Sequence, residues 1–386
     1  MTPRWHWDRI SMTTDHVPGK LILACALGIA TACTAPLPMP TPAPEPPTPL
    51  GPVRLARVQA AYDNLGGALA AWRFHFEKPD CLLLFAERDE WLLGCEDLFT
   101  NDGFIPTGET RDAQIVRWNR RSFLFDGKLR PYDDIKLTLV AQVVRYADEK
   151  AQVDRPVLVM QEWDALHAHH PGFQHDSLEF WLASFVHESF HSQQGRYARV
   201  RAMSDRDRAG GLAGPKDLEA FYRQNAGFRA AVTSEYDLLR AASTDPALDA
   251  AKAKAALGAW LALSRQRAAT FAAALERAYP GQHALEKERY LIFLEGSARY
   301  VEASFLTHPA DATIAPLASE PTFQRFAASR GRQPAELPGL GNLGANYFYT
   351  LGMYLCLLLD HADPGWKQHL FDDDGFLVAA VERAAS

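Results

Sequence analysis

The sequence predicts an α+β protein, in which a mixed N-terminal part with short β-strands is followed by a mainly helical C-terminal part. Three observations lead to this prediction. Short apolar, β-prone segments precede residue 161, and Ala-rich stretches with helical periodicity follow residue 215. Between them, residues 176–194 place apolar side chains at helical spacing around several ionisable ones. We therefore expect one long helix to separate the two parts.

Residues 1–32 have the pattern of a signal peptide. Basic residues precede an apolar run, 21–32, that is shorter than the roughly twenty residues needed to span a bilayer. Small residues directly before Cys33 resemble a bacterial lipobox. The resemblance implies a lipid anchor on Cys33 and a place in the bacterial cell envelope, and Thr34 after the cysteine favours the outer membrane. Ordinary secretion with cleavage near Ala32 is the alternative.

A proline-rich tether, residues 33–54, follows this segment. Alternating prolines remove backbone donors and favour an extended polyproline conformation, so neither helix nor sheet is expected there. The tether would hold the remaining chain, 55–386, away from a membrane. We divide that domain into an α/β part, 55–174, and a helical part, 175–386.

The α/β part is expected to begin with a helix over 53–72. Two short strands should follow, paired around a polar turn centred on Arg88. In that register Cys81 and Cys95 face each other, which predicts a disulfide in an oxidising compartment, with two buried thiols as the alternative. Cys356 would then be a free thiol in the core.

Further elements are expected along the chain. Asp126-Gly127 indicates a tight turn, residues 135–144 are β-prone although a helix is also compatible, and residues 156–160 indicate a strand. In the helical part, breaks at proline and glycine separate four predicted helices, 216–242, 246–278, 282–306 and 346–362.

His187-Glu188-Ser-Phe-His191 is the pattern HExxH, and it lies inside the long central helix. Residues four apart share one helix face, so His187 and His191 can bind one metal ion while Glu188 lies beside them. Zinc held by three protein ligands retains a position for water, and a neighbouring carboxylate can accept that water's proton. The sequence thus predicts a Zn²⁺ site, with two buried core histidines as the alternative.

The third ligand must come from another segment. Metzincins continue HExxH with a glycine and a third ligand, but this chain has Gln194 and Tyr197 at those positions. The best candidate is Glu295, in a stretch with helical spacing of apolar residues where Gly296 permits close approach of another backbone. A solvated helix carboxylate is the alternative for Glu295.

Glu295-Gly-Ser-Ala-Arg299-Tyr300 resembles the EGxAxY motif of gluzincin-type zinc metallopeptidases, which pair HExxH with a glutamate from a later helix. The resemblance implies a zincin-like fold with His187, His191 and Glu295 as zinc ligands and Glu188 as general base. It also implies that the strand near 156–160 forms the edge of the substrate cleft, where a substrate can pair with its free backbone as an extra strand. Some members carry an acidic residue where this chain has Arg299, so we expect Glu302, one turn further on, to orient a histidine ligand.

Four other residues could contact the substrate or the oxygen that gains charge in the reaction. They are Tyr347, Tyr349, Arg299 and Tyr300, for which packing or an ion pair is the structural alternative. A second cluster precedes the central helix and is expected to be a loop rich in exposed histidine, with a second metal site as the alternative. It consists of His167, His169, His170 and His175.

Together these features predict an envelope metallopeptidase that cleaves peptide or protein substrates. A non-catalytic lipoprotein with the same fold, serving as a binding or assembly module, is the main alternative. The presence of Glu188 argues against it, because a structural site needs no general base. Hydrolysis of a non-peptide amide is a third option. The formal net charge of −7 gives no basic surface for nucleic acid.

Overall fold

The structure is a computed structural model of the chain. It describes residues 46–68, 72, 81–86, 89–94, 104–111, 113–119, 122–125, 128–131, 141–148, 153–169, 178–307, 324, 328, 331–337, 339–371 and 376–386. The predicted signal peptide, Cys33 and most of the predicted tether lie outside these residues. The end of the tether contacts the domain, since the Leu50 and Gly51 amides both donate to Glu109.

A six-stranded mixed sheet organises the N-terminal part. In spatial order it contains β3 (Ile105–Arg111), β4 (Gln114–Asn119), β2 (Asp89–Gly94), β1 (Cys81–Ala86), β8 (Val153–Gln161) and β7 (Ala141–Asp148). Only β1 and β8 run parallel; the other neighbours are antiparallel. A separate hairpin is formed by β5 (Ser122–Phe125) and β6 (Lys128–Pro131).

The position of each strand follows from its side chains. The β1 sequence Cys-Leu-Leu-Leu-Phe is continuously apolar and buried, as expected for a strand covered on both faces. By contrast, β3 alternates between partly and fully exposed residues and lies at an edge of the sheet. Neither β3 nor β4 was expected from the sequence, because both mix polar residues with too few apolar ones to give a clear period.

The predicted hairpin is present, with a register shifted by one residue. Ala86 pairs with Asp89, so the connection holds two residues and Gly94, rather than Cys95, lies opposite Cys81. Cys81 is disulfide-bonded. Cys95 directly follows Gly94 but lies outside the described residues, so its pairing with Cys81 stays a prediction. Cys356 is a buried free thiol, as predicted.

The strand predicted at 156–160 falls within β8, and β7 covers the end of the predicted 135–144 segment. β8 does not form an edge of the sheet. It pairs in parallel with β1 on one side and antiparallel with β7 on the other. The expectation that this strand borders a cleft with its backbone free is therefore wrong, because both of its neighbouring positions are taken.

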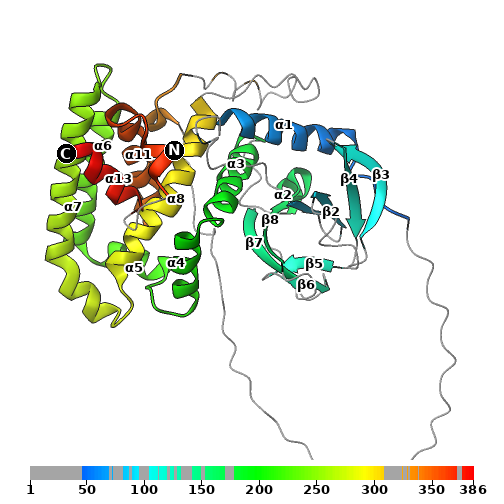
Figure 1. Cartoon of the computed structure of the whole chain (residues 1–386), viewed down its shortest axis with the longest axis horizontal. Helices are drawn as coiled ribbons and strands as arrows, with labels where there is room; N and C mark the ends of the chain where they lie inside the picture. Colours follow the sequence, from blue (N-terminus) through cyan, green and yellow to red (C-terminus); the bar gives the residue numbers. More distant parts are fainter. Residues whose placement is uncertain are drawn as a thin grey trace, which may run out of the picture.

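The helices are shown in Figure 1. They are α1 (Pro52–Ala68), α2 (Trp163–His169), α3 (Leu178–Gln194), α4 (Ala198–Arg208), α5 (Pro215–Gln224), α6 (Ala226–Ser243), α7 (Ala250–Ala278), α8 (Ala284–Thr307), α11 (Tyr347–Ala362), α12 (Trp366–His369) and α13 (Phe376–Ala385). The predicted helix 216–242 is divided at Asn225, whose side chain accepts from the Phe228 amide and caps α6. The α+β prediction is confirmed.

Helix α8 occupies the centre of the helical part. It packs on α3 and α11, and most of its 24 residues are buried. Its closest contact is with α11, where a Cβ on Gly296 would lie 2.4 Å from the Gly352 Cα. Only glycine at both positions allows two backbones to approach this closely. This contact fixes α11 against the segment of α8 that carries Glu295.

One hydrophobic core runs through both parts of the protein. It includes Leu82 and Leu158 of the sheet, Trp181 and Phe185 of α3, and Leu291 of α8. Helix α3 therefore lies between the sheet and the helical part, as Figure 1 shows. Among the described residues, no helix is long and apolar enough to cross a membrane.

Candidate metal centre

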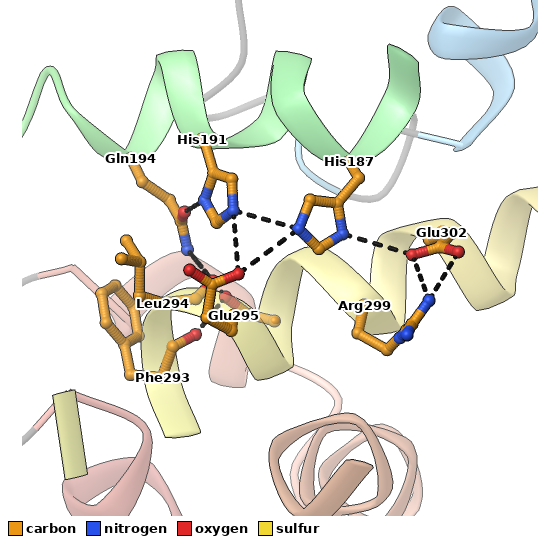
Figure 2. Close-up of polar contacts among 9 residues, drawn as sticks. His187, His191, Gln194, Phe293, Leu294, Glu295, Arg299 and Glu302 are labelled. Carbon is orange, nitrogen blue, oxygen red and sulfur yellow. Dashed lines mark hydrogen bonds and ion pairs between the residues drawn. The ribbon is translucent and has the colours of Figure 1, made fainter. Parts of the chain in front are cut away.

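Helix α3 presents His187, Glu188 and His191 toward α8. Their ligand atoms, one from each residue, lie within 4.8 Å of one another, and His187 and Glu188 are buried. The i and i+4 spacing places the two imidazoles on one face of the helix, as the sequence predicted. This group could hold a metal ion. Figure 2 shows both rings pointing from α3 toward the side chains of α8.

Glu295 of α8 completes a small triangle of ligand atoms. The two Nε2 atoms of His187 and His191 are 3.1 Å apart. Glu295 Oε2 lies 3.3 Å from Nε2 of His191 and 3.5 Å from Nε2 of His187. Ligands about 2.0–2.1 Å from a tetrahedral ion are about 3.3–3.4 Å apart. The three atoms thus have the spacing of one face of a tetrahedral zinc site.

Gln194 fixes the tautomer of His191. Its Nε2 donates to the Leu294 carbonyl (3.0 Å) and to Ser297 Oγ (2.9 Å), and a carbonyl oxygen can only accept. The amide oxygen therefore faces His191, where it lies 2.6 Å from Nδ1. Nδ1 must be the donor, which leaves the lone pair of His191 on Nε2, the atom that belongs to the triangle.

Glu302 orients the ring of His187 in a similar way. Its Oε2 lies 3.2 Å from His187 Nδ1, so this ring also donates through Nδ1 and exposes the Nε2 lone pair. Arg299 in turn donates through Nη1 to both oxygens of Glu302, at 2.7 and 2.9 Å. The expectation that Glu302 orients a histidine matches this geometry. Arg299 adopts the ion-pair alternative, since its guanidinium is directed at Glu302.

With both imidazoles neutral, the triangle brings together three electron-pair donors, and this arrangement needs a cation, either a proton or a metal ion. Burial by itself lowers the pKa of His187, but the hydrogen bonds to Glu295 and Glu302 outweigh it and raise that pKa to about 9. Burial would raise the pKa of Glu295, yet the two histidines hold it well below its usual range. The donor set fits a divalent metal ion.

Glu188 lies beside the triangle in a buried position. Burial, chiefly, and then the charges of Glu295 and Glu302 raise the pKa of Glu188, while the two histidines oppose the shift. A carboxylate with a raised pKa is a better proton acceptor than one in water, and the ideal general base has a pKa near the working pH. The environment of Glu188 thus suits proton transfer.

Of the two candidate tyrosines on α11, only Tyr349 reaches this centre. Its ring stacks on that of His187, with centroids 6.0 Å apart, and its phenol is near enough to Glu295 for that carboxylate to raise the pKa of Tyr349. Burial, followed by the charges of Glu295 and Glu188, raises the pKa of Tyr349 well above its ordinary value. The phenol therefore stays protonated and can donate a hydrogen bond.

The other two tyrosines are held elsewhere. The phenol of Tyr347 donates to Glu288, about two turns before Glu295 on α8, and that of Tyr300 donates to Asp360 at 2.5 Å. Residues two apart on a helix point about 200° apart, so Tyr347 does not share the direction of Tyr349. Tyr300 is five residues after Glu295 and points about 140° away from it. Tyr347 and Tyr300 are therefore packing residues with internal hydrogen bonds and do not point into the candidate metal centre.

The predicted histidine loop is only partly described. The expectation of a loop is wrong for His167 and His169, which lie in α2, where the ring of His167 packs against that of Trp163 with centroids 4.6 Å apart. His170 and His175 lie outside the described residues, as does the side chain of His169. The question of a second metal site therefore stays open.

Sequence reasoning missed Gln194. It considered this position only as the place of a metzincin glycine, and no motif marks a residue three after the second histidine as its partner. The available signal was spacing, because residues i and i+3 of a helix are neighbours.

A scan of protein-family models finds no match to this chain, and searches of curated proteins and of solved structures find none either.

Proposed function

We propose that this protein hydrolyses peptide bonds with a zinc ion held by His187, His191 and Glu295, and with Glu188 as general base. The observation that carries the proposal is the triangle of two imidazole nitrogens and one carboxylate oxygen, with a fourth ionisable group, Glu188, beside it. A site with only three protein ligands leaves a position for a reactant. The proposal includes the zincin-like fold.

Zinc is the metal we propose, because two neutral imidazoles and one carboxylate with tetrahedral spacing suit it. When bound, zinc would supply Lewis acidity that polarises the substrate carbonyl and lowers the pKa of a coordinated water. Glu302 and Gln194 keep the two imidazoles in the tautomer that exposes Nε2. Such partners orient ligands and raise their basicity.

Glu188 carries the proton through the reaction. It accepts a proton from the attacking water as the oxygen of that water bonds to the carbonyl carbon. It then gives this proton to the leaving nitrogen as the C–N bond breaks, and the products are an amine and a carboxylic acid. The raised pKa of Glu188 supports the first step, since it favours uptake of the proton.

Tyr349 is the donor we propose for the carbonyl oxygen as it gains charge. Its phenol lies against Glu295 and His187, and its pKa is raised by burial and by nearby carboxylates. A donor placed at the developing charge stabilises the transition state more than the ground state. Arg299 is not assigned this role because it pairs with Glu302.

The substrate and location belong to the same proposal. We propose a peptide or protein substrate, and an envelope location with the domain tethered through a lipid on Cys33. These proposals rest on the sequence pattern alone, since Cys33 lies outside the described residues.

The test compares the wild-type protein with Glu188→Gln in an assay on a diverse peptide mixture. The substitution keeps size and polarity but removes the proton acceptor, so zinc content should stay at one ion per chain while turnover falls by about a hundred- to ten-thousand-fold. A chelator should abolish wild-type cleavage, and added zinc should restore it. Near wild-type turnover in Glu188→Gln would exclude the proposed mechanism.

A further inference from the structure

The first turn of α11 carries Tyr349 but lacks the usual means of holding a helix start. Its N-cap residue, Asn346, has φ −91° and ψ 42°, and its side chain makes no capping hydrogen bond. The first turn contains no acidic residue that would interact with the helix dipole. Uncapped first turns are the part of a helix that opens most easily. Tyr349 is the third residue of the helix and would move with this turn.

A buried polar cluster, here named the Arg267 cluster, contacts the first turn of α11 through Tyr347. Arg267 Nη1 donates to both oxygens of Glu288, at 2.7 and 2.8 Å, and its Nε donates to Glu235 at 2.5 Å. Trp260 Nε1 donates to the second Glu235 oxygen at 3.0 Å, and the Tyr347 phenol donates to Glu288. The cluster joins α6, α7 and α8 to the first residue of α11.

Every member of the Arg267 cluster is buried, with exposed fractions from 0% to 4%. Hydrogen bonds to charged groups are stronger than neutral ones, and a buried network that is fully satisfied is rigid. A second contact with α8 is made further along α11 at Gly352. Tyr347 and Gly352 therefore bracket Tyr349 at two points, both of which are attached to the helix that carries Glu295.

We infer that Tyr347, held by the Arg267 cluster, is a positioning residue that replaces the missing cap and places the Tyr349 phenol at the candidate metal centre. This inference rests on the proposed function for its catalytic consequence. The mechanical part, that the cluster holds the first turn of α11, is independent of any activity.

The mechanical part is tested by hydrogen exchange on the metal-loaded protein. Tyr347→Phe removes only the bond to Glu288, and exchange of the amides at 347–350 should become about tenfold faster or more, as expected for the loss of a hydrogen bond to a charged group. Lys287→Met is the matched control, since it removes a buried ion pair to Asp207 (2.6 Å) from the same helix without touching α11. Unchanged exchange at 347–350 in Tyr347→Phe would overturn the inference.

The catalytic part is tested by a double-mutant cycle. Tyr349→Phe should lower kcat by about a hundred- to a thousand-fold, the usual effect of removing one donor to the developing charge. Tyr347→Phe should lower kcat at least tenfold through displacement of that donor, with KM changed less than about twofold. In the Tyr349→Phe background, Tyr347→Phe should have no further effect on kcat.

The outcomes separate the inference from the proposed function. Equal effects of Tyr347→Phe with and without the Tyr349 phenol would overturn the positioning role, because they would show an effect that does not pass through Tyr349. If the wild-type protein cleaves no peptide, the proposed function fails, while hydrogen exchange still decides whether the Arg267 cluster holds the turn. Trp260→Phe, a milder change at the far end of the cluster, should accelerate exchange at 347–350 less than Tyr347→Phe does.

Discussion

Gln194 and Glu302 orient the two histidines of the candidate metal centre by different means. Glu302 places a charge on Nδ1 of His187, whereas Gln194 offers a neutral amide oxygen to Nδ1 of His191. A carboxylate partner makes an imidazole more basic, so His187 should be the stronger ligand of the two. Gln194 has a second function, because its amide also binds α3 to the backbone of α8 at Leu294.

At this scale we predict that Gln194→Met lowers zinc affinity by about ten- to a hundred-fold, the usual effect of losing a partner of a metal ligand. Methionine keeps the side-chain length but cannot hold the Nδ1 hydrogen of His191. Competition with a chromogenic chelator measures the affinity. Gln193→Met is the control, because the Gln193 amide is equally buried but donates to Ser192. Equal losses in both variants would show that the effect comes from general packing.

At the scale of elements, α8 is the helix that contributes carboxylates both to the candidate metal centre and to the Arg267 cluster. It supplies Glu295 and Glu302 to the site and Glu288, about two turns before Glu295 on the same side of the helix, to the Arg267 cluster. Buried carboxylates are tolerated only where they are paired, and each of these three has a cationic or hydrogen-bonding partner. The charges of α8 are thus distributed between two separate networks.

The close contact between α8 and α11 gives the second prediction. A methyl group on Gly352 would lie 2.1 Å from the Ile292 carbonyl oxygen, so Gly352→Ala must push the helices apart. We expect a loss of about 1–3 kcal/mol or more in the free energy of unfolding, despite the better helix propensity of alanine. Denaturant unfolding measures it. Gly344→Ala meets nothing within 4 Å and should change stability by less than about 0.5 kcal/mol.

At the scale of the whole molecule, the site lies where the two parts of the chain meet. His187 and His191 come from the helix that packs on the sheet, while Glu295 comes from the centre of the helical part. A single core connects them. Metal binding should therefore stabilise the packing of α3 on α8, and with it the whole fold, by mass action.

The stability of the protein should depend on pH in opposite ways with and without zinc. In the metal-free protein the pKa of His187 is raised from 6.5 to about 9, so protonated His187 stabilises the fold below about pH 6.5 and this contribution is lost as the pH rises through about 9. Zinc requires unprotonated imidazoles and competes better at high pH.

Thermal unfolding between pH 6.5 and 9 checks this prediction. The Tm of the chelated protein should fall across the range, and the increase in Tm produced by zinc should grow. His187→Gln should weaken the fall in Tm of the chelated protein without abolishing it, because the pKa of His191 is also raised by Glu295. It should also remove most of the increase in Tm produced by zinc, because a proposed ligand is lost. A chelated protein whose Tm rises steadily from pH 6.5 to 9 would contradict the assignment.

Anchoring is the other prediction at this scale. In a Gram-negative host, labelled fatty acid should be incorporated into the wild-type protein, whereas Cys33→Ser should abolish labelling and release the domain from membranes. A single lipid-bearing residue accounts for both effects. Membrane association of Cys33→Ser without lipid would show that residues 1–32 have been misinterpreted.

Several features could be predicted because they depend on neighbouring residues. The apolar run of β1, the helical spacing around His187 and His191, and the Glu-Gly pair at 295–296 all express local periodicity. Strands β3 and β4 could not be predicted, since their stability comes from pairing within the sheet rather than from their composition. The register of the β1–β2 hairpin depended on a two-residue connection that sequence spacing alone does not reveal.

The sequence by itself determined the α+β class and the pair of imidazoles beside Glu188, because residues four apart on a helix share a face whatever surrounds them. It also singled out Glu295 as a third partner. Only the tertiary structure decided which phenol reaches the site, since Tyr347 and Tyr349 are near neighbours whose directions are set by the packing of α11 on α8. Tautomers, too, were decided by tertiary contacts, because Nδ1 of each ring meets its acceptor only in the folded protein.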